Sequence, residues 1–493
     1  MTAVAEPSIQ TTSQVPAPVS DTKSSQQAVE RAIIDASTSG PILTFFATAI
    51  SWLFGATIFW LIATTKLCFP NFLADCAWLT YGRVVPAYNA AFIYGWCSLA
   101  GMGAAIWLMA RLCRVPIKAP GVLIFGAILW NVGLTVGVWQ ILGGRTTGIE
   151  GMEIPHGAMW IMFAGFLLIG LWGAALFRAR RESFAYVSVW YLLGAFFWFP
   201  WVFAISNLLT ALPEVRGVMP VVIASWLSHS LNIWWFTPIG LAAAYYLIPK
   251  VINRPVHSYN LASVGFWSFA LLGGLTGMTR LSGGPVPAWL VTVSIAANIM
   301  MIVPIAMVTA NFVLTMKGRM EMIHLSPTVR FTFFGVILFT IGSLLNVISS
   351  LRSVDQFLHF TPWAQGQQQL LLYGFFSMVI FGAIYYITPR LVGCEWLSST
   401  LIKYHFWGSA YGGGTVILML LLTGISMGGA LRDPDGLFSQ VISSSLEFLA
   451  GQLIGMVMLT LGHVIFALHF LLMLMRIGQP GGEATLFATH DEH

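Results

Sequence analysis

Long apolar stretches alternate with short polar segments along the whole chain. Twelve of these stretches approach the roughly 20 residues that a helix needs to cross a lipid bilayer. They cover residues 43–65, 86–110, 122–142, 158–176, 184–208, 221–248, 261–278, 290–314, 331–350, 370–387, 407–423 and 448–475. The pattern therefore predicts an all-α integral membrane protein with twelve transmembrane helices.

Polar segments flank the apolar region at both ends. Residues 1–30 are rich in Ser, Thr, Gln and Pro and contain no apolar core. This composition is typical of a disordered tail and not of a signal peptide. We predict three parts: a disordered cytoplasmic tail over 1–40, a membrane domain over 41–476, and a short cytoplasmic tail over 477–493.

The composition excludes several other classes of protein. Of the 493 residues, 57% are hydrophobic and only 8% are charged, whereas soluble chains carry roughly 25% charged residues. The net charge of +5 is too small to indicate a nucleic-acid-binding protein. The lipid bilayer is therefore the predicted environment of the chain.

Lys and Arg residues predict the orientation in the membrane. With twelve spans both termini lie on one side, and sixteen of the 23 Lys and Arg residues fall on that side. Basic residues concentrate on the cytoplasmic side of membrane proteins. We therefore predict that both termini are cytoplasmic.

Few ionisable side chains fall within the predicted spans, where they would point to function. The near absence of carboxylates there counts against an ion pump or a cation-coupled transporter. Only His229, His463 and His469 lie within spans, and His405 falls in a predicted cytoplasmic loop. Six residues turn a helix by about 240°, so His463 and His469 face different directions. We interpret these two as polar side chains hydrogen-bonded to a neighbouring helix.

Two spans end with the same pattern. The sixth ends with YYLIPK at residues 245–250, and the tenth with YYITPR at 385–390. Paired Tyr residues suit the membrane interface, and proline followed by a cation suits a cytoplasmic helix end. The repeat favours internal pseudo-symmetry.

Several segments resemble subunit I of the cbb-type haem–copper (cytochrome c) oxidases. Residues 226–232 read WLSHSLN and lead to YYLIPK, residues 254–259 read RPVHSY, and residues 359–366 read HFTPWAQG. The corresponding segments of that family read W-x-G-H-N-A-V-G-F, Y-Y-x-x-P-K, R-P-V-Y-S-Y and H-Y-T-D-W-T-I-G. The similarity runs from about residue 40 to 476. It implies the twelve-helix architecture of haem–copper oxidase subunit I in a bacterial inner membrane.

The resemblance also implies positions for cofactor binding. Six His residues of the family hold a low-spin haem, a high-spin haem and a copper ion, and His229 is the one that this chain retains. The family's redox tyrosine falls on Gly273. The haem-ligand positions are Tyr88, Gln367 and Gln369, and the copper-ligand positions are His229, Thr279 and Arg280.

The substituted side chains are poor replacements for imidazole. Tyr can ligate ferric haem as a phenolate, but it suits a low-spin electron-transfer haem badly, and the Gln amide is a weak ligand for iron. A protonated Arg280 repels a copper ion, and His229 alone does not make a copper site. Arg280 either supplies a positive charge in a polar network with Tyr88 and the two glutamines, or extends to the outer interface.

Three functions are compatible with these observations. The first is a redox-inactive relative without a cofactor, which serves as a scaffold or partner for c-type cytochromes or other respiratory subunits. The second is a working cytochrome c oxidase subunit that holds haem b and copper through unusual ligands. The third is transport through the vacated haem cavity, which no specific residue supports. We favour the first, because five of the six ligands are replaced.

Overall fold

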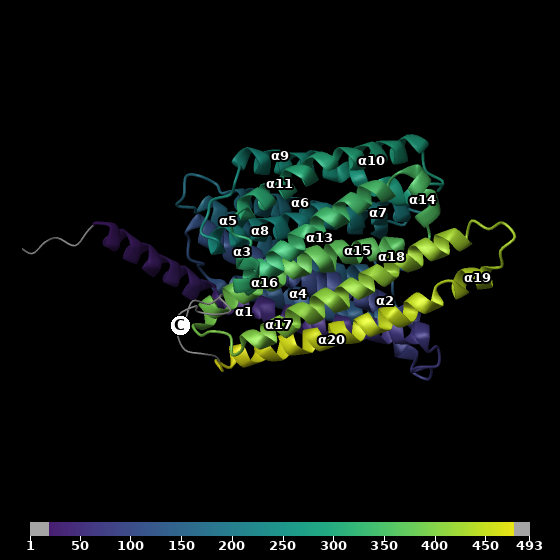
Figure 1. Ribbon diagram of the computed structural model, residues 1–493, viewed down its shortest axis with the longest axis horizontal. Helices are drawn as coiled ribbons and strands as arrows, with labels where there is room; N and C mark the ends of the chain where they lie inside the picture. Colours follow the sequence, from purple (N-terminus) through teal and green to yellow (C-terminus); the bar gives the residue numbers. More distant parts are fainter. Residues whose placement is uncertain (1–18, 478–493) are drawn as a thin grey trace, which may run out of the picture.

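The computed structural model describes residues 19–477 as a bundle of long helices (Figure 1). Twelve segments of this part of the chain are long and apolar enough to cross a membrane, which confirms the predicted number. The segments are Gln26–Cys68, Tyr81–Cys113, Pro120–Leu142, His156–Arg178, Val187–Ala211, Met219–Val251, Tyr259–Leu281, Ala288–Met316, Pro327–Ser349, Trp363–Val392, Ser399–Ala430 and Phe438–Leu474.

Five spans are each formed by a single continuous α-helix. These are α1 (Val19–Cys68), α4 (Pro120–Leu142), α5 (His156–Arg178), α6 (Val187–Ala211) and α13 (Pro327–Ser349). Short helices precede or connect some spans: η1 (Ala77–Leu79), α12 (Met322–Leu325), α14 (Arg352–Leu358) and, before α20 (Leu446–Leu474), α19 (Phe438–Ser443).

The twelfth span consists of α19 and α20. The other six spans are built from consecutive helical elements. They are α2 (Tyr81–Ala90), η2 (Ala91–Cys97) and α3 (Ser98–Cys113); α7 (Met219–Leu231), η3 (Asn232–Phe236) and α8 (Thr237–Val251); α9 (Tyr259–Leu272) and η4 (Gly273–Leu281); α10 (Ala288–Met300) and α11 (Ile302–Met316); α15 (Trp363–Gln369), η5 (Leu370–Ser377) and α16 (Met378–Val392); and α17 (Ser399–Trp407), η6 (Gly408–Gly412) and α18 (Gly413–Ala430).

The second, sixth and tenth spans form the centre of the bundle. In their most apolar stretches 94%, 78% and 94% of the residues are buried, against 33–44% in the other nine spans. A helix that faces lipid exposes part of its apolar surface, whereas a helix surrounded by others buries all sides. The bundle is therefore three inner helices enclosed by nine outer ones.

Each inner span contains a π-helical stretch. These are η2, η3 and η5, and the eleventh span has another in η6. A π turn adds one residue to the helical turn and is frequent at functional sites. The recurrence in all three inner spans extends the pseudo-symmetry that the repeated span ends indicate.

The repeated span ends meet at the cytoplasmic end of the bundle, as defined by the predicted orientation. The rings of Tyr246 and Tyr386 lie 6.3 Å apart, edge to face. Trp107, in the second span, contacts both rings at 5.7 and 6.0 Å. Equivalent ends of the three inner spans thus pack around one aromatic cluster.

The prediction of a disordered tail over 1–40 is wrong for residues 19–40, which form the first part of α1 (purple in Figure 1). Ile34 and Asp35 are only 2% and 8% exposed. The Asp35 carboxylate lies 3.4 Å from the Arg111 guanidinium and accepts a hydrogen bond from Trp107 Nε1 at 3.1 Å. These contacts with α3 fix the first part of α1. The composition of residues 1–40 alone does not reveal such contacts. Residues 1–18 and 478–493 lie outside the described residues.

We predict that Asp35→Ala lowers thermal stability strongly. The change leaves the buried Arg111 without its counter-charge, and breaking such a pair costs about 3–5 kcal/mol. Thermal unfolding in detergent measures the loss. The control is Glu30→Gln, which removes more exposed ion pairs with Arg114 and Arg181 and should change stability by less than about 1 kcal/mol. Equal effects of the two variants would contradict the anchoring role of Asp35.

Candidate site at the outer ends of the inner helices

The predicted ligand positions lie just before the π turns of the inner helices. Tyr88 precedes η2 by three residues, and His229 precedes η3 by three. Gln367 also precedes η5 by three, and Gln369 precedes it by one. The three inner spans therefore present equivalent positions toward the predicted outer end of the bundle, opposite the repeated span ends.

Tyr88 and Gln369 bond directly to each other. The Gln369 amide Nε2 donates a hydrogen bond to the Tyr88 hydroxyl at 2.7 Å. Both side chains are buried, at 2% and 4% exposure. The Tyr88 ring also packs between Trp60, at 4.7 Å, and Phe92, at 5.6 Å between ring centroids. The pair thus joins the second and tenth spans in a closely packed region.

This arrangement does not fit a haem held between the two positions. Axial ligands on opposite faces of one iron lie roughly 4 Å apart, since each metal–nitrogen bond is about 2 Å. The two side chains approach within hydrogen-bond distance, and no porphyrin plane passes between them. A cavity of about 300 Å³ touches Tyr88, but Gln369 is not part of its lining.

The other four predicted positions share a second cavity, of about 410 Å³. His229 reaches it from α7, Thr279 and Arg280 from η4, and Gln367 from α15. Its lining is rich in polar side chains, which also include Glu150, Asn232, Asn298, Ser343, Asn346, Asp355, His359 and Gln368.

The 3₁₀ geometry of η4 orients the threonines of this cavity. In a 3₁₀ helix residues i and i+3 lie on the same face, so Thr276 and Thr279 both line the cavity. Gly273 occupies the preceding position on that face, where a Cβ atom would lie 2.4 Å from Ile233 Cγ2 and 2.7 Å from Trp234 Nε1. The position of the family's redox tyrosine therefore has no space for a side chain.

His229 Nε2 is hydrogen-bonded to the Thr276 hydroxyl at 2.6 Å. The same hydroxyl lies 2.8 Å from the Gly273 carbonyl. Which group donates between His229 and Thr276 depends on the tautomer of the ring. The contact engages Nε2, and Nδ1 stays available to a metal.

Arg280 is exposed and lines the cavity together with Glu150. Among residues 26–477 no side chain lies within hydrogen-bond or ion-pair distance of its guanidinium. The predicted network of Arg280 with Tyr88 and the two glutamines is thus wrong in part: Gln367 shares the cavity, but Tyr88 and Gln369 pair with each other on the far side of the tenth span. A guanidinium beside a single imidazole does not fit a copper ion.

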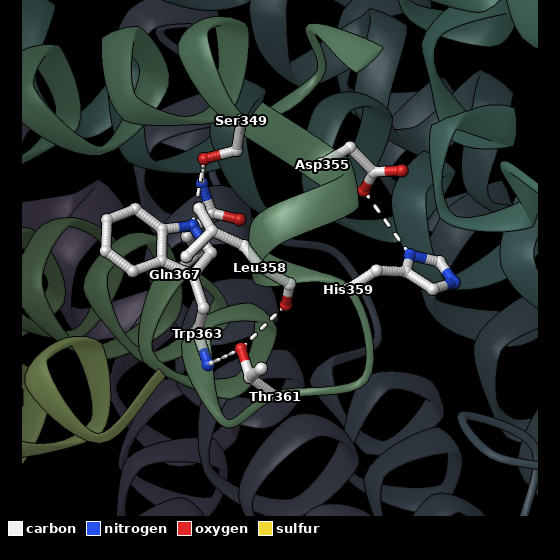
Figure 2. Close-up of polar contacts among 7 residues, drawn as sticks. All are labelled: Ser349, Asp355, Leu358, His359, Thr361, Trp363 and Gln367. Atoms are coloured by element: carbon white, nitrogen blue, oxygen red, sulfur yellow. Dashed lines mark hydrogen bonds and ion pairs between the residues drawn. The ribbon is translucent and has the colours of Figure 1, made fainter. Parts of the chain in front are cut away.

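Gln367 and Gln369 point in different directions, as expected for residues two apart on a helix. Gln367 Nε2 donates to Ser349 Oγ at 2.9 Å, and Trp363 Nε1 donates to the same oxygen at 2.8 Å (Figure 2). Gln367 is thereby tied to the end of α13.

The outer rim of the cavity carries charged residues from two loops. Figure 2 shows His359 facing Asp355, with 3.3 Å between Nδ1 and the carboxylate. Glu150 lies in the loop between α4 and α5, which is held by a hydrogen bond of 3.2 Å from Asn89 to Glu153. Burial raises the pKa of Glu153.

Sequence reasoning missed an amide pair in the cavity wall. Asn298 Nδ2 donates to the Thr276 carbonyl at 3.0 Å, and Asn346 Nδ2 donates to Asn298 Oδ1, also at 3.0 Å. Uncharged amides inside apolar spans are the signal that could have found them, because buried polar groups require partners.

Three further histidines, His405, His463 and His469, lie outside the predicted ligand positions. His463 accepts or donates bonds to Thr57 and Tyr373 at 2.7 and 2.9 Å, which confirms its interpretation as a side chain bonded to neighbouring helices. His469 Nε2 accepts a longer bond of 3.4 Å from the Ser398 amide. The placement of His405 in a loop is wrong: it is fully buried in α17 and bonds to Tyr385 at 2.8 Å.

Among residues 19–477 no group of three or more His, Cys, Asp or Glu side chains is arranged to hold a metal ion. The polar groups of the cavity can instead bind water, or a polar solute with hydrogen-bond acceptors and negative charge.

Comparison with known proteins identifies the family. The sequence model for cytochrome c and quinol oxidase polypeptide I matches residues 40–465. A cytochrome c oxidase subunit 1 homolog of Agrobacterium tumefaciens is 25% identical over 451 residues, which cover 86% of this chain and 83% of the relative.

Two further relatives agree with this result. Cytochrome c oxidase subunit 1 of Rhodobacter capsulatus is 24% identical, with 84% of this chain and 82% of the relative covered. The cbb3-type cytochrome c oxidase subunit CcoN1 of Stutzerimonas stutzeri is also 24% identical, with 78% and 82% covered. The twelve spans and these bacterial relatives indicate a multi-pass protein of a bacterial inner membrane. The chain belongs to the cytochrome c and quinol oxidase polypeptide I family and has the haem–copper oxidase subunit I fold.

Proposed function

We propose that this chain is a redox-inactive relative of the cbb-type oxidase subunit I, retained as a scaffold or partner subunit of a respiratory complex. The hydrogen bond between Tyr88 and Gln369 carries this proposal. Because the two side chains bond directly, no space remains between them for the iron of a low-spin haem. Without that haem the chain has no cofactor there to accept electrons. The membrane orientation with cytoplasmic termini is part of the proposal.

The second cavity supports the same conclusion. Arg280 contributes a permanent positive charge beside His229, and His229 Nε2 is hydrogen-bonded to Thr276. Gly273 leaves no room for the redox tyrosine. The positive charge and the missing tyrosine each count against oxygen reduction in this cavity.

The alternative is a working cytochrome c oxidase subunit with haem b and copper, which the names of its relatives favour. Transport through the vacated cavity has less support. The buried rings of Phe236 and Phe376 pack 5.1 Å apart between the inner helices.

We predict that the purified protein, produced in cells with ample haem, contains less than about one haem per ten chains. Absorption spectroscopy and pyridine-haem quantitation provide the measurement. The full chain should co-purify with c-type cytochrome or other respiratory subunits when isolated from its native membrane. Two haems per chain, with oxygen consumption, would refute the proposal and establish the oxidase alternative.

We predict that Tyr88→Phe and Gln369→Leu each lower thermal stability, by about 1–3 kcal/mol, because each leaves a buried polar group without its partner. The double variant should lose less than the sum of the two. The matched control is Tyr94→Phe, since the buried Tyr94 hydroxyl has no hydrogen-bond partner among the described residues and its removal should be neutral. Additive losses in the double variant would contradict a direct bond.

We predict that Gly273→Ala destabilises the protein by about 1–3 kcal/mol, because the added Cβ overlaps Ile233 and Trp234. Gly55→Ala is the control, as no atom lies within 4 Å of its added Cβ. Thermal unfolding compares the two. Tolerance of Ala at 273 would show that the pocket can still accept a side chain.

A further inference from the structure

We propose that the 300 Å³ cavity beside Tyr88 binds a neutral ring compound with carbonyl oxygens, such as a quinone ring, taken up from the membrane. The cavity lies between residues of the first, second, tenth, eleventh and twelfth spans. The inference rests on the proposed function in one respect, namely that no haem occupies this space.

Two buried side chains of the cavity wall lack a hydrogen-bond partner. Trp60 on α1 is 6% exposed, and Gln452 on α20 is 3% exposed. Among residues 26–477 neither the Trp60 indole N–H nor the Gln452 amide makes a hydrogen bond. The polar atoms of both side chains remain accessible and are not sealed in packed protein. Because a buried polar group without a partner is costly, both groups require a partner inside the cavity.

The type of these groups indicates what would pair with them. An indole N–H can only donate, so Trp60 requires an acceptor atom. The Gln452 amide offers two further N–H donors. Gln365 lines the cavity from α15, and its side chain also makes no hydrogen bond among residues 26–477. A carbonyl oxygen can accept from each of these donors.

The buried hydroxyl groups of the wall are already engaged. Thr64, Thr423 and Ser445 donate to backbone carbonyls at 2.9, 2.7 and 2.6 Å. The Tyr88 hydroxyl accepts a hydrogen bond from Gln369. The indole and amide groups are therefore the ones left to bind a ligand.

The charge and polarity of the wall indicate a neutral and mostly apolar ligand. None of the described residues that line this cavity is charged, and most are aliphatic, including Val85, Leu420 and Leu449. An ion would lose its hydration there without meeting a counter-charge, whereas an apolar ring packs well against such walls. Leu67 and Leu446, at the rim, are 37% and 54% exposed, which leaves the cavity open to the surroundings of the bundle.

The cavity volume limits the size of the ligand. A water molecule takes about 30 Å³ of liquid volume, so 300 Å³ corresponds to roughly ten waters. One substituted six-membered ring fits this space. Duroquinone serves as the probe, because it carries carbonyl acceptors and its fully substituted ring does not add to thiols. Tetramethylbenzene has the same ring and methyl groups but no acceptor.

The experiment measures duroquinone uptake by equilibrium dialysis, with the full-length protein in nanodiscs compared with empty nanodiscs of the same lipid. We expect saturable uptake of about one molecule per chain above the lipid background, and weaker binding of tetramethylbenzene. Gln452→Leu and Trp60→Phe each remove a donor and should weaken duroquinone binding by about threefold or more, as expected for one hydrogen bond. Both variants should take up tetramethylbenzene as the wild type does, which shows that the cavity is still folded.

The matched control is Gln368→Leu, which changes a glutamine of the tenth span that lines the 410 Å³ cavity instead. This variant should bind duroquinone as the wild type does. No saturable uptake by the wild type, equal binding of the two compounds, or unchanged binding by both Gln452→Leu and Trp60→Phe would each overturn the inference. Haem quantitation on the same samples separates the two proposals: bound haem refutes both, whereas a haem-free protein that does not take up duroquinone refutes only the ligand site.

Discussion

Polar side chains buried in the membrane interior must find partners, and this requirement governs the whole outer part of the structure. An unpaired amide or hydroxyl costs several kcal/mol in an apolar medium. When imidazoles that bind metals are replaced by such groups, the replacements must bond to one another or to the backbone. Tyr88 and Gln369 do so across two helices, and His229 does so through Thr276. The predicted ligand positions thereby form hydrogen bonds within the family's fold.

The framework itself does not depend on the chemistry of these positions. Three inner helices, each with a π turn after the ligand position, are enclosed by nine helices that face lipid. Their ends opposite the predicted ligand positions meet around Trp107. Large apolar surfaces therefore maintain the fold, whichever polar side chains stand at the predicted ligand positions. The family's fold is physically compatible with substitution of its ligand residues for this reason.

The apolar runs of the sequence were sufficient to predict the twelve spans, and the motifs around His229 placed the six substituted positions. What the sequence could not provide was the pairing of side chains. Tyr88 and Gln369 are 281 residues apart, and only the packing of two helices brings them together, so the sequence left open whether Arg280 joins them in a network or extends to the interface. The helical start of α1 was missed for the same reason, since Asp35 is held by contacts with a distant helix.

Open space remains at both groups of predicted ligand positions. A cavity of about 300 Å³ touches Tyr88, whose hydroxyl bonds to Gln369. The cavity around Arg280 measures about 410 Å³. A dry void of this size would cost on the order of 10 kcal/mol at about 24 cal/mol per Å³, so the polar lining keeps it filled with water or solute. The lining contains the Arg280 guanidinium together with the Glu150 and Asp355 carboxylates. Such charged and polar groups are hydrated at no void cost, so replacing the ligand residues with polar side chains does not require the cavity to collapse.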